Sequence, residues 1–176
     1  RSAFNTGMYQ TTLGAHHQRS HRPDEPGYRP HPLPEGVRIL PDWMRDQGYL
    51  TADLVQLPSE MGFKGSAHTD WNFTYEGKPV DTAAWSELKE RQPFYAQPNL
   101  PEAHRGPNWD AASAKLTRPA DPAKVQVPPY YPDHPIVRKH WAGYIDSING
   151  LDTRVGEILA RLEADGLADD TVVVFF

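Results

Sequence analysis

An apolar stripe runs through residues 144 to 162. Its members recur at steps of three or four residues: Tyr144, Ile145, Ile148, Leu151, Val155, Ile158, Leu159 and Leu162. That spacing predicts an amphipathic helix of about five turns, which Gly166 ends. The segment TVVVFF that follows has the composition of a strand covered on both faces. A helix that leads through a short loop into such a strand predicts an α/β fold, with a mostly parallel sheet between helices.

Weaker patterns predict the remaining elements. Residues 1 to 17 favour two short helical pieces, interrupted at Gly7 and Gly14. The apolar spacing in VRILPDWMRDQG favours a short amphipathic helix. The other expected elements are a strand in YLTADLV, a helix in TAAWSELKERQ, a strand in PFYAQPNL, and proline-rich loops over residues 18 to 36 and 101 to 135.

Composition excludes several classes of function. The 176 residues carry a formal net charge of -5 with a pI near 5.9, so a basic surface for nucleic acid is not expected. No apolar stretch approaches the roughly 18 residues of a membrane span, and we expect no membrane partner. The sequence has no cysteine, which excludes disulfides within it and leaves the compartment open.

The first seven residues, RSAFNTG, resemble the end of the modification motif of the sulfatase family. That motif contains Cys or Ser, any residue, Pro, Ser and Arg, then variable positions, a hydrophobic residue and Thr-Gly. Arg1 matches the arginine, and Thr6 and Gly7 match the closing pair. Phe4 stands one place earlier than the strictest spacing. The nucleophile of the motif would stand four residues before Arg1.

Four further stretches resemble the same family, in the same order. LPDWMRDQGYLTADL is similar to the helix-to-strand unit after the nucleophile helix, and GFKGSAHTDWNFTYEGKP to a segment with Gly-Lys-Thr-Asp-Trp/Tyr-Asn-Phe. PFYAQPNLPEAHRGP resembles a strand that ends in a substrate-side histidine. The stretch from residue 144 to 176 resembles a long helix and strand that lead into Ser-Asp-His-Gly. The resemblance therefore covers nearly the whole chain.

The resemblance implies an alkaline-phosphatase-like α/β fold, of which residues 1 to 176 form part of a single catalytic domain truncated at both ends. It implies an enzyme that hydrolyses a sulfate monoester or an N-linked sulfate. The implied cofactors are formylglycine, made from Cys or Ser, and a calcium ion, both mainly from residues outside this sequence. We therefore expect these residues alone to be inactive. The implied partners are a sulfated small molecule or glycan and a formylglycine-generating enzyme, and the implied location is periplasmic or secreted.

Two candidate catalytic residues match the family pattern. Arg1 has a permanent, fork-shaped charge that could hold the nucleophile and neutralise charge nearby. His104 follows an apolar strand and lies in a polar loop, a position from which side chains reach clefts in α/β folds. Its imidazolium could bind sulfate or protonate the leaving oxygen. We expect the two side chains to converge on one pocket that holds a tetrahedral anion.

Two further candidates depart from the family pattern. His68 stands where relatives have Lys, so its contact with sulfate would carry a titratable charge. Asp70 stands where the wider family has a second histidine, and it could equally make an Asx turn beside Trp71. Met8 also replaces a residue that is basic in many relatives.

Two other functions remain open. One is hydrolysis of a phosphonate or phosphate ester, since the same cations can hold either tetrahedral anion. The other is a relative without catalytic activity that binds sulfated glycans, and His68 and Met8 motivate it. The residue four before Arg1 separates the sulfatase from the phosphonate or phosphate ester hydrolase. Cys or Ser there supports formylglycine, whereas Thr favours a phosphodiesterase-like enzyme.

Other histidines and aromatic residues have simpler interpretations. Adjacent helix positions face different directions, so His16, His17 and His21 do not form a metal site by spacing alone. Three tryptophans are expected to pack: Trp43, Trp71 and Trp141. Three aromatic residues in proline-rich loops could form an aromatic wall for substrate: Trp109, Tyr130 and Tyr131.

Overall fold

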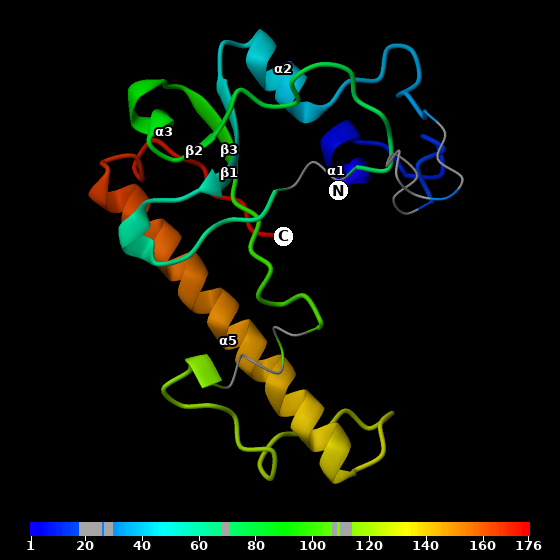
Figure 1. Ribbon diagram of the computed structural model, residues 1–176, viewed down its shortest axis with the longest axis vertical. Helices are drawn as coiled ribbons and strands as arrows, with labels where there is room; N and C mark the ends of the chain where they lie inside the picture. The colour runs from blue at the N-terminus through cyan, green and yellow to red at the C-terminus, as the bar shows by residue number, and fades with distance from the viewer. Residues whose placement is uncertain (18–25, 27–29, 68–70, 107–108, 110–113) are drawn as a thin grey trace. The chain divides into compact units, whose positions relative to one another are not determined.

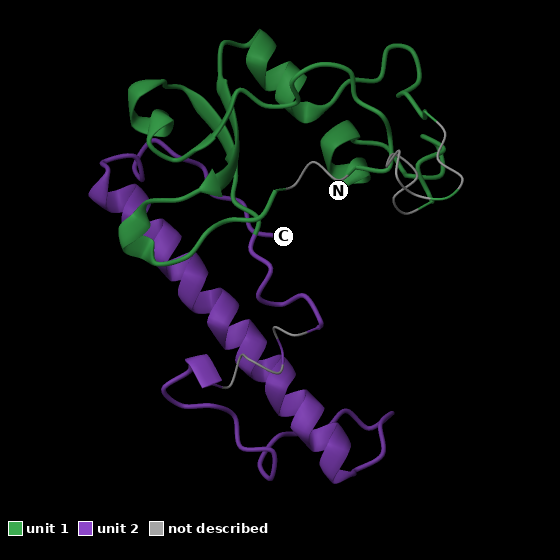
Figure 2. Ribbon diagram, viewed as in Figure 1, with its two compact units in different colours: residues 1–99 green, residues 100–176 purple. Residues whose placement is uncertain are grey.

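The computed structural model describes residues 1–17, 26, 30–67, 71–106, 109 and 114–176. The chain divides into two compact units, Arg1–Asn99 and Leu100–Phe176, which we call the N-terminal unit and the C-terminal unit (Figure 2). The expectation that residues 1 to 176 form part of one catalytic domain stays a prediction. None of the helices in the described ranges has the length and apolar character needed to cross a membrane.

The described part of the N-terminal unit contains a three-stranded parallel sheet in the order β2-β1-β3 (Figure 1). The central strand β1 spans Leu50–Gln56, β2 spans Thr82–Ala84 and β3 spans Phe94–Gln97. Ala52 lies opposite Thr82 on one side and Ala96 on the other. Helices flank the sheet, so the predicted α/β class with a parallel sheet is confirmed. The arrangement is consistent with part of an alkaline-phosphatase-like domain.

Helix α2, Leu40–Asp46, packs on β1 and leads into it. Pro41 fits the first turn of this helix, because proline lacks the N–H that a helix start leaves unpaired. Ile39 just before the helix is fully buried against Trp71 and Phe73, whose rings stack 5.2 Å apart. This cluster joins the start of α2 to the segment after residue 70.

Residues 82 to 92 do not form the single helix that the sequence predicts. They form β2, and α3 covers only Glu87–Glu90. The Thr82 hydroxyl donates to the Glu87 carboxylate and accepts from the Ala84 N–H. Pairing with β1 satisfies the backbone of the first residues, so tertiary contact overrides their helical preference.

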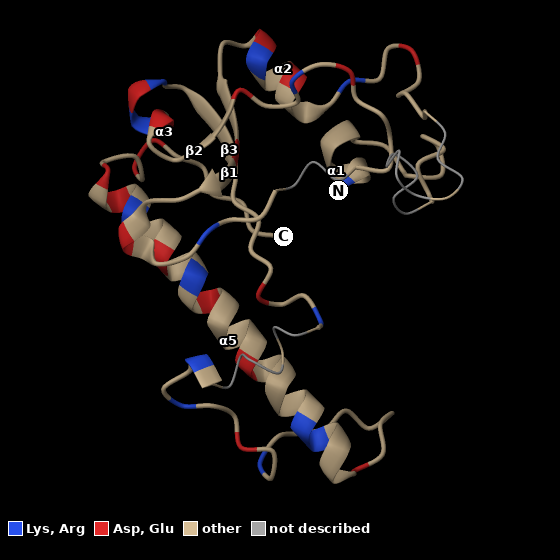
Figure 3. Cartoon of the chain, in the orientation of Figure 1, with Lys and Arg blue, Asp and Glu red and all other residues tan. Residues whose placement is uncertain are grey.

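Helix α5, Pro135–Ala164, confirms the helix predicted from the apolar stripe. It begins earlier in the chain than the stripe does. His134 caps its start by accepting from the Ile136 N–H at 3.3 Å. Gly166 ends it in the left-handed region, with a φ of 70°. Acidic and basic side chains are interspersed along the helix (Figure 3).

Three further local predictions are wrong. TVVVFF is neither a strand nor buried, since Val172 is 91% and Phe176 75% exposed. It pairs with no strand among the described residues, and a strand needs a neighbour for its backbone hydrogen bonds. Residues 10 to 14 form turns after α1, Ser2–Thr6, instead of a second helical piece. Trp43 is half exposed rather than packed, with the Arg38 guanidinium 4.6 Å from its ring.

Candidate functional site

The stretch RSAFNTG forms α1 and its end. The Thr6 hydroxyl donates to the Ser2 carbonyl at 2.9 Å. Gly7 adopts a φ of 68°, and its N–H donates to the Ala3 carbonyl at 2.8 Å. This left-handed cap favours glycine, because a Cβ there would be strained. The Thr-Gly pair therefore stops the helix, and Arg1 lies exposed at its start.

A close backbone approach lies where β1 and β3 end. The Gly65 N–H donates to the Val55 carbonyl at 3.2 Å, and the Ser66 N–H donates to the Asn99 carbonyl at 2.9 Å. A Cβ at Gly65 would lie 1.9 Å from the Leu54 carbonyl oxygen, so only glycine fits. The segment before residue 68 is thus attached at the carboxyl ends of two parallel strands. Ligands of open parallel sheets bind outside this edge.

The segment after residue 70 is attached to α1. The Asn72 N–H donates to the Ser2 hydroxyl oxygen at 3.1 Å, and Ser2 is only 4% exposed. The adjacent Trp71 is buried in the core. Hydrogen bonds therefore connect three stretches that carry the sequence resemblance, within residues 1–7, 62–79 and 93–99. Both hydrogen bonds lie within the N-terminal unit: one joins the 62–79 stretch to α1, and the other joins it to the chain that follows β3.

His104 lies in the C-terminal unit. Its backbone N–H donates to the Pro101 carbonyl at 3.0 Å, and its ring Nδ1 lies 2.8 Å from the Arg105 carbonyl oxygen. Because a carbonyl only accepts, this contact requires the hydrogen on Nδ1 and leaves Nε2 for a ligand. The side chain is exposed, so Nε2 is accessible.

The structure describes two of the four predicted site residues, Arg1 and His104. His68 and Asp70 lie outside the described residues, so their roles stay predictions. Arg1 belongs to the N-terminal unit and His104 to the C-terminal unit. Their convergence on one pocket likewise stays a prediction.

Polar side chains on the sheet form a group that was not predicted from the sequence. Asp53 on β1 lies opposite Gln97 on β3, and Tyr95 lies two residues before Gln97 on the same face of the strand. Burial raises the pKa of Tyr95 to about 12, and the charge of Asp53 acts in the same direction. The alternation in LTADLVQ could have indicated the β1 member of this group, because it places the polar Thr51 and Asp53 on one face of the strand.

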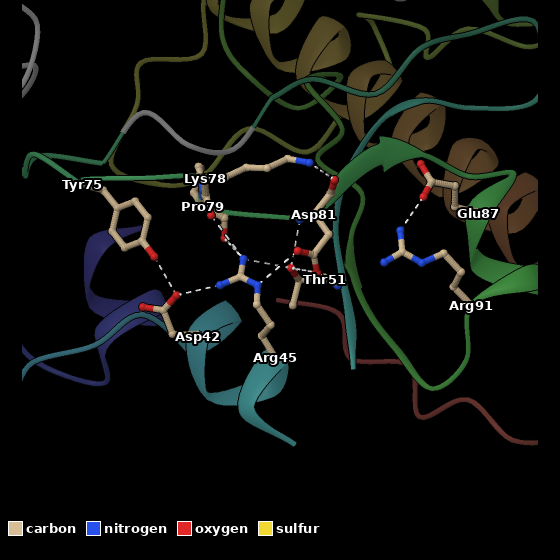
Figure 4. Close-up of polar contacts among 9 residues, drawn as sticks. All are labelled: Asp42, Arg45, Thr51, Tyr75, Lys78, Pro79, Asp81, Glu87 and Arg91. Atoms are coloured by element: carbon tan, nitrogen blue, oxygen red, sulfur yellow. Dashed lines mark hydrogen bonds and ion pairs between the residues drawn. The ribbon is translucent and has the colours of Figure 1, made fainter. Parts of the chain in front are cut away.

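A dense polar network is centred on Arg45 (Figure 4). Its guanidinium donates to Asp81 at 3.1 Å, to Asp42 at 3.0 Å, and to the Lys78 and Pro79 carbonyls at 3.2 Å each. The Tyr75 hydroxyl donates to Asp42 at 2.6 Å. These bonds join α2 to the loop before β2.

A cavity of about 370 Å³ lies beside this network. Its lining residues are Arg45, Gly48, Tyr49, Leu50, Asp81, Arg91, Gln92 and Pro93. They precede β1, β2 and β3 or begin them, so the cavity lies at the amino ends of the strands. Arg45 is held by Asp81, and Arg91 is held by Glu87 at 2.8 Å. Both cations are therefore already neutralised, and the network holds the sheet together.

Metal ligands are not grouped in the described ranges. Those residues contain no cluster of three or more His, Asp or Glu that could hold a metal ion. The rings of His16 and His17 lie 4.3 Å apart. His21 falls outside the described residues.

Comparison with known proteins gives one informative similarity. The chain is 27% identical to an ulvan-active sulfatase of Formosa agariphila over 213 aligned positions, which cover all of this chain and 34% of the relative. That relative is a sulfatase. The similarity supports a sulfatase-like function for this chain at the level of the family. The chain spans about a third of the relative's length. No family model matches the chain, and no solved structure matches it.

Proposed function

We propose that this chain contributes part of the active site of a sulfatase that hydrolyses a sulfate monoester or an N-linked sulfate. One observation carries the proposal: hydrogen bonds link three of the stretches that resemble sulfatase motifs, and one of these bonds lies at the carboxyl edge of a parallel sheet. Asn72 bonds to Ser2, and Ser66 bonds to Asn99. The similarity to the ulvan-active sulfatase extends over the same residues.

The reaction needs cations on the sulfate oxygens and an acid for the leaving group. In this proposal Arg1 neutralises charge beside the nucleophile, because its guanidinium stays protonated. As an imidazolium, His104 donates the Nε2 proton to the leaving oxygen and becomes neutral, while its Nδ1–H stays bonded to the Arg105 carbonyl. A carbonyl in that position fixes the orientation of the ring.

His68 and Asp70 complete the proposed site. His68 as imidazolium would contact a sulfate oxygen, and Asp70 would accept a hydrogen bond and orient a neighbouring donor. A histidine loses its charge as the pH rises, whereas a lysine would keep it. Activity should therefore fall at high pH, and the variant His68→Lys should retain more of it there. Equal pH profiles for the two proteins would remove His68 from the sulfate contact.

Formylglycine and calcium belong to the proposal through the resemblance alone. When present, formylglycine supplies the oxygen nucleophile and calcium neutralises charge on it. The described residues offer no group of three metal-ligating side chains, so they do not by themselves fit the ion. We assign no calcium ligand in this chain, and no step above runs through the metal.

The test uses the full-length protein after maturation by a formylglycine-generating enzyme. We expect turnover of an aryl sulfate or of sulfated sugars, and a loss of about a hundredfold or more in kcat for His104→Ala. The matched control is His140→Ala, an exposed histidine of the same unit, which should keep full activity. Equal activity in both variants would remove His104 from the reaction.

Two outcomes would replace the proposed function. Absence of turnover on every sulfate ester, with the modification confirmed by mass, would favour a protein that binds sulfated glycans without cleaving them. Faster turnover of phosphonate or phosphate esters than of sulfates would favour the other hydrolase activity.

A further inference from the structure

Among the described residues of the C-terminal unit, five aromatic rings form a continuous series beside the first half of α5. Neighbouring ring centroids are 5.0 Å apart for Tyr130 and Tyr131, 6.2 Å for Tyr131 and Trp141, 5.1 Å for Trp141 and Tyr144, and 5.3 Å for Tyr144 and Trp109. We call this series the aromatic ladder. The prediction of an aromatic wall included Trp109, Tyr130 and Tyr131, and α5 supplies the two rings that connect them.

The Trp109 end of the ladder is held in place from several sides. Its indole Nε1 donates to the Ala103 carbonyl at 3.3 Å. The Arg105 guanidinium lies 5.7 Å from the centroid of its ring, within the range of a cation–π contact. A Cβ at Gly143 would lie 3.4 Å from the Trp109 carbonyl oxygen, so the loop approaches α5 closely there. A ring fixed in this way loses little conformational entropy when a ligand packs against it.

The other end of the ladder is open to solvent. Tyr130 is 76% and Tyr131 is 50% exposed. Their rings are tilted by 52° to each other, so they do not cover one another's faces. Each presents an apolar ring together with a polar hydroxyl, a combination enriched where a partner is partly apolar and partly wet.

A sugar ring fits this surface better than an aliphatic side chain. One face of a pyranose carries C–H groups and can cover an aromatic ring, while its hydroxyls stay in water or bond to a tyrosine. A series of separate, tilted rings suits a series of linked sugars. Charge favours an anionic chain, because the ladder ends beside the exposed Arg105 and the adjacent His104.

We propose that the aromatic ladder binds successive sugar rings of a sulfated oligosaccharide and directs one sulfate to the end marked by His104 and Arg105. This inference rests on the proposed function and deepens it, since it assigns the substrate to a glycan chain. Small aryl sulfates reach only the cationic end, so the ladder contributes to the binding of long substrates alone.

The test measures binding to the full-length protein, produced without the maturation enzyme so that the probe is not consumed. The probes are a sulfated carrageenan hexasaccharide and its desulfated counterpart, titrated by calorimetry. Replacing both exposed rings, in Tyr130→Ala/Tyr131→Ala, should raise the Kd for the sulfated probe by about tenfold. The matched control Tyr9→Ala removes a tyrosine that is 81% exposed in the other unit, and it should leave the Kd unchanged.

Two further measurements separate the contributions. Tyr130→Phe/Tyr131→Phe keeps the rings and should retain most of the affinity. Arg105→Ala should weaken binding of the sulfated probe and leave any binding of the desulfated probe unaltered. The inference is overturned if the double alanine variant binds like Tyr9→Ala, or if the wild type binds both probes equally.

The outcome is distinguishable from failure of the proposed function. In the matured protein, the double alanine variant should raise the KM for the hexasaccharide and leave aryl sulfate hydrolysis unchanged. If the wild type cleaves no sulfate ester but the ladder variants still lose hexasaccharide binding, the proposed function fails and the ladder assignment stands. If aryl sulfate is cleaved and the ladder variants bind the hexasaccharide normally, the proposed function stands and the ladder assignment fails.

Discussion

Removing the Asp81 carboxylate should loosen the start of β1. Asp81 accepts from the Thr51 N–H at 2.9 Å, from the Thr51 hydroxyl at 2.8 Å, and from Arg45 Nε at 3.1 Å. Thr51 is fully buried, so Asp81→Ala leaves its N–H without this acceptor in a place that water does not reach.

The size of the effect follows from these contacts. A hydrogen bond to a charged group contributes about 1.5–3 kcal/mol, and contributions from one network are not additive. The Asp81 side chain is 25% exposed, so water can replace part of what is lost on the Arg45 side. We therefore expect Asp81→Ala to lower the free energy of unfolding by about 2–4 kcal/mol. Asp81→Asn, which keeps one acceptor oxygen, should cost less.

The assay is urea denaturation combined with hydrogen exchange of peptides that cover β1. The control is Asp46→Ala, which removes an exposed ion pair with Arg38 from the same helix region. We expect no measurable shift of its urea midpoint, because exposed pairs contribute little. If Asp81→Ala shifts the midpoint no more than Asp46→Ala, and the exchange of β1 is unchanged, the network around Arg45 does not hold the sheet.

The pH dependence provides an independent check. Burial alone would raise the pKa of Asp81, but hydrogen bonds from Thr51 and Arg45 outweigh it and lower that pKa. A carboxyl with a lowered folded pKa stabilises the protein above its unfolded pKa of about 3.9, and this stabilisation is lost as the pH falls through the folded pKa. The stability difference between wild type and Asp81→Ala should therefore stay constant near neutral pH and shrink only in acid. A difference that shrinks toward alkaline pH would refute the assignment.

Three smaller predictions concern single positions. Gly65→Ala should destabilise by about 1–3 kcal/mol in urea denaturation, because its Cβ would overlap the Leu54 carbonyl, and an unchanged midpoint would contradict that approach. Gly156→Ala on α5 meets nothing within 4 Å and should raise the free energy of unfolding by roughly 1 kcal/mol, so a loss of stability would mean an unseen contact. Under the proposed function, Ser2→Ala in the full-length protein should lower kcat by releasing Asn72, and a kcat equal to wild type would show that this bond does not position the site.

Strong local patterns made some elements predictable. The stripe from Tyr144 to Leu162 has one helical face over many turns, and the structure confirms it in α5. The strands in YLTADLV and PFYAQPNL also form, as β1 and β3. Their patterns are weaker than the helical stripe, since YLTADLV alternates only weakly and PFYAQPNL is a short apolar run.

Predictions failed where the sequence was ambiguous and a distant partner decided. Thr82–Ala84 has no strong strand preference, and pairing with β1 makes it a strand. TVVVFF has a strong strand preference, yet it pairs with no strand in the described residues. Trp43 follows the helical period but lies under Arg38 at the surface.

For the candidate site, the sequence named the residues that we propose carry the chemistry and the stretches that resemble sulfatase motifs. Arg1, His104, His68 and Asp70 were named from residue type and order alone, since charge and proton affinity belong to the side chain itself. Only the tertiary structure could show that Ser2 meets Asn72 and that Ser66 meets Asn99. The same holds for the Arg45 network and the aromatic ladder. These contacts join residues far apart in the chain, and their geometry depends on packing that no local pattern encodes.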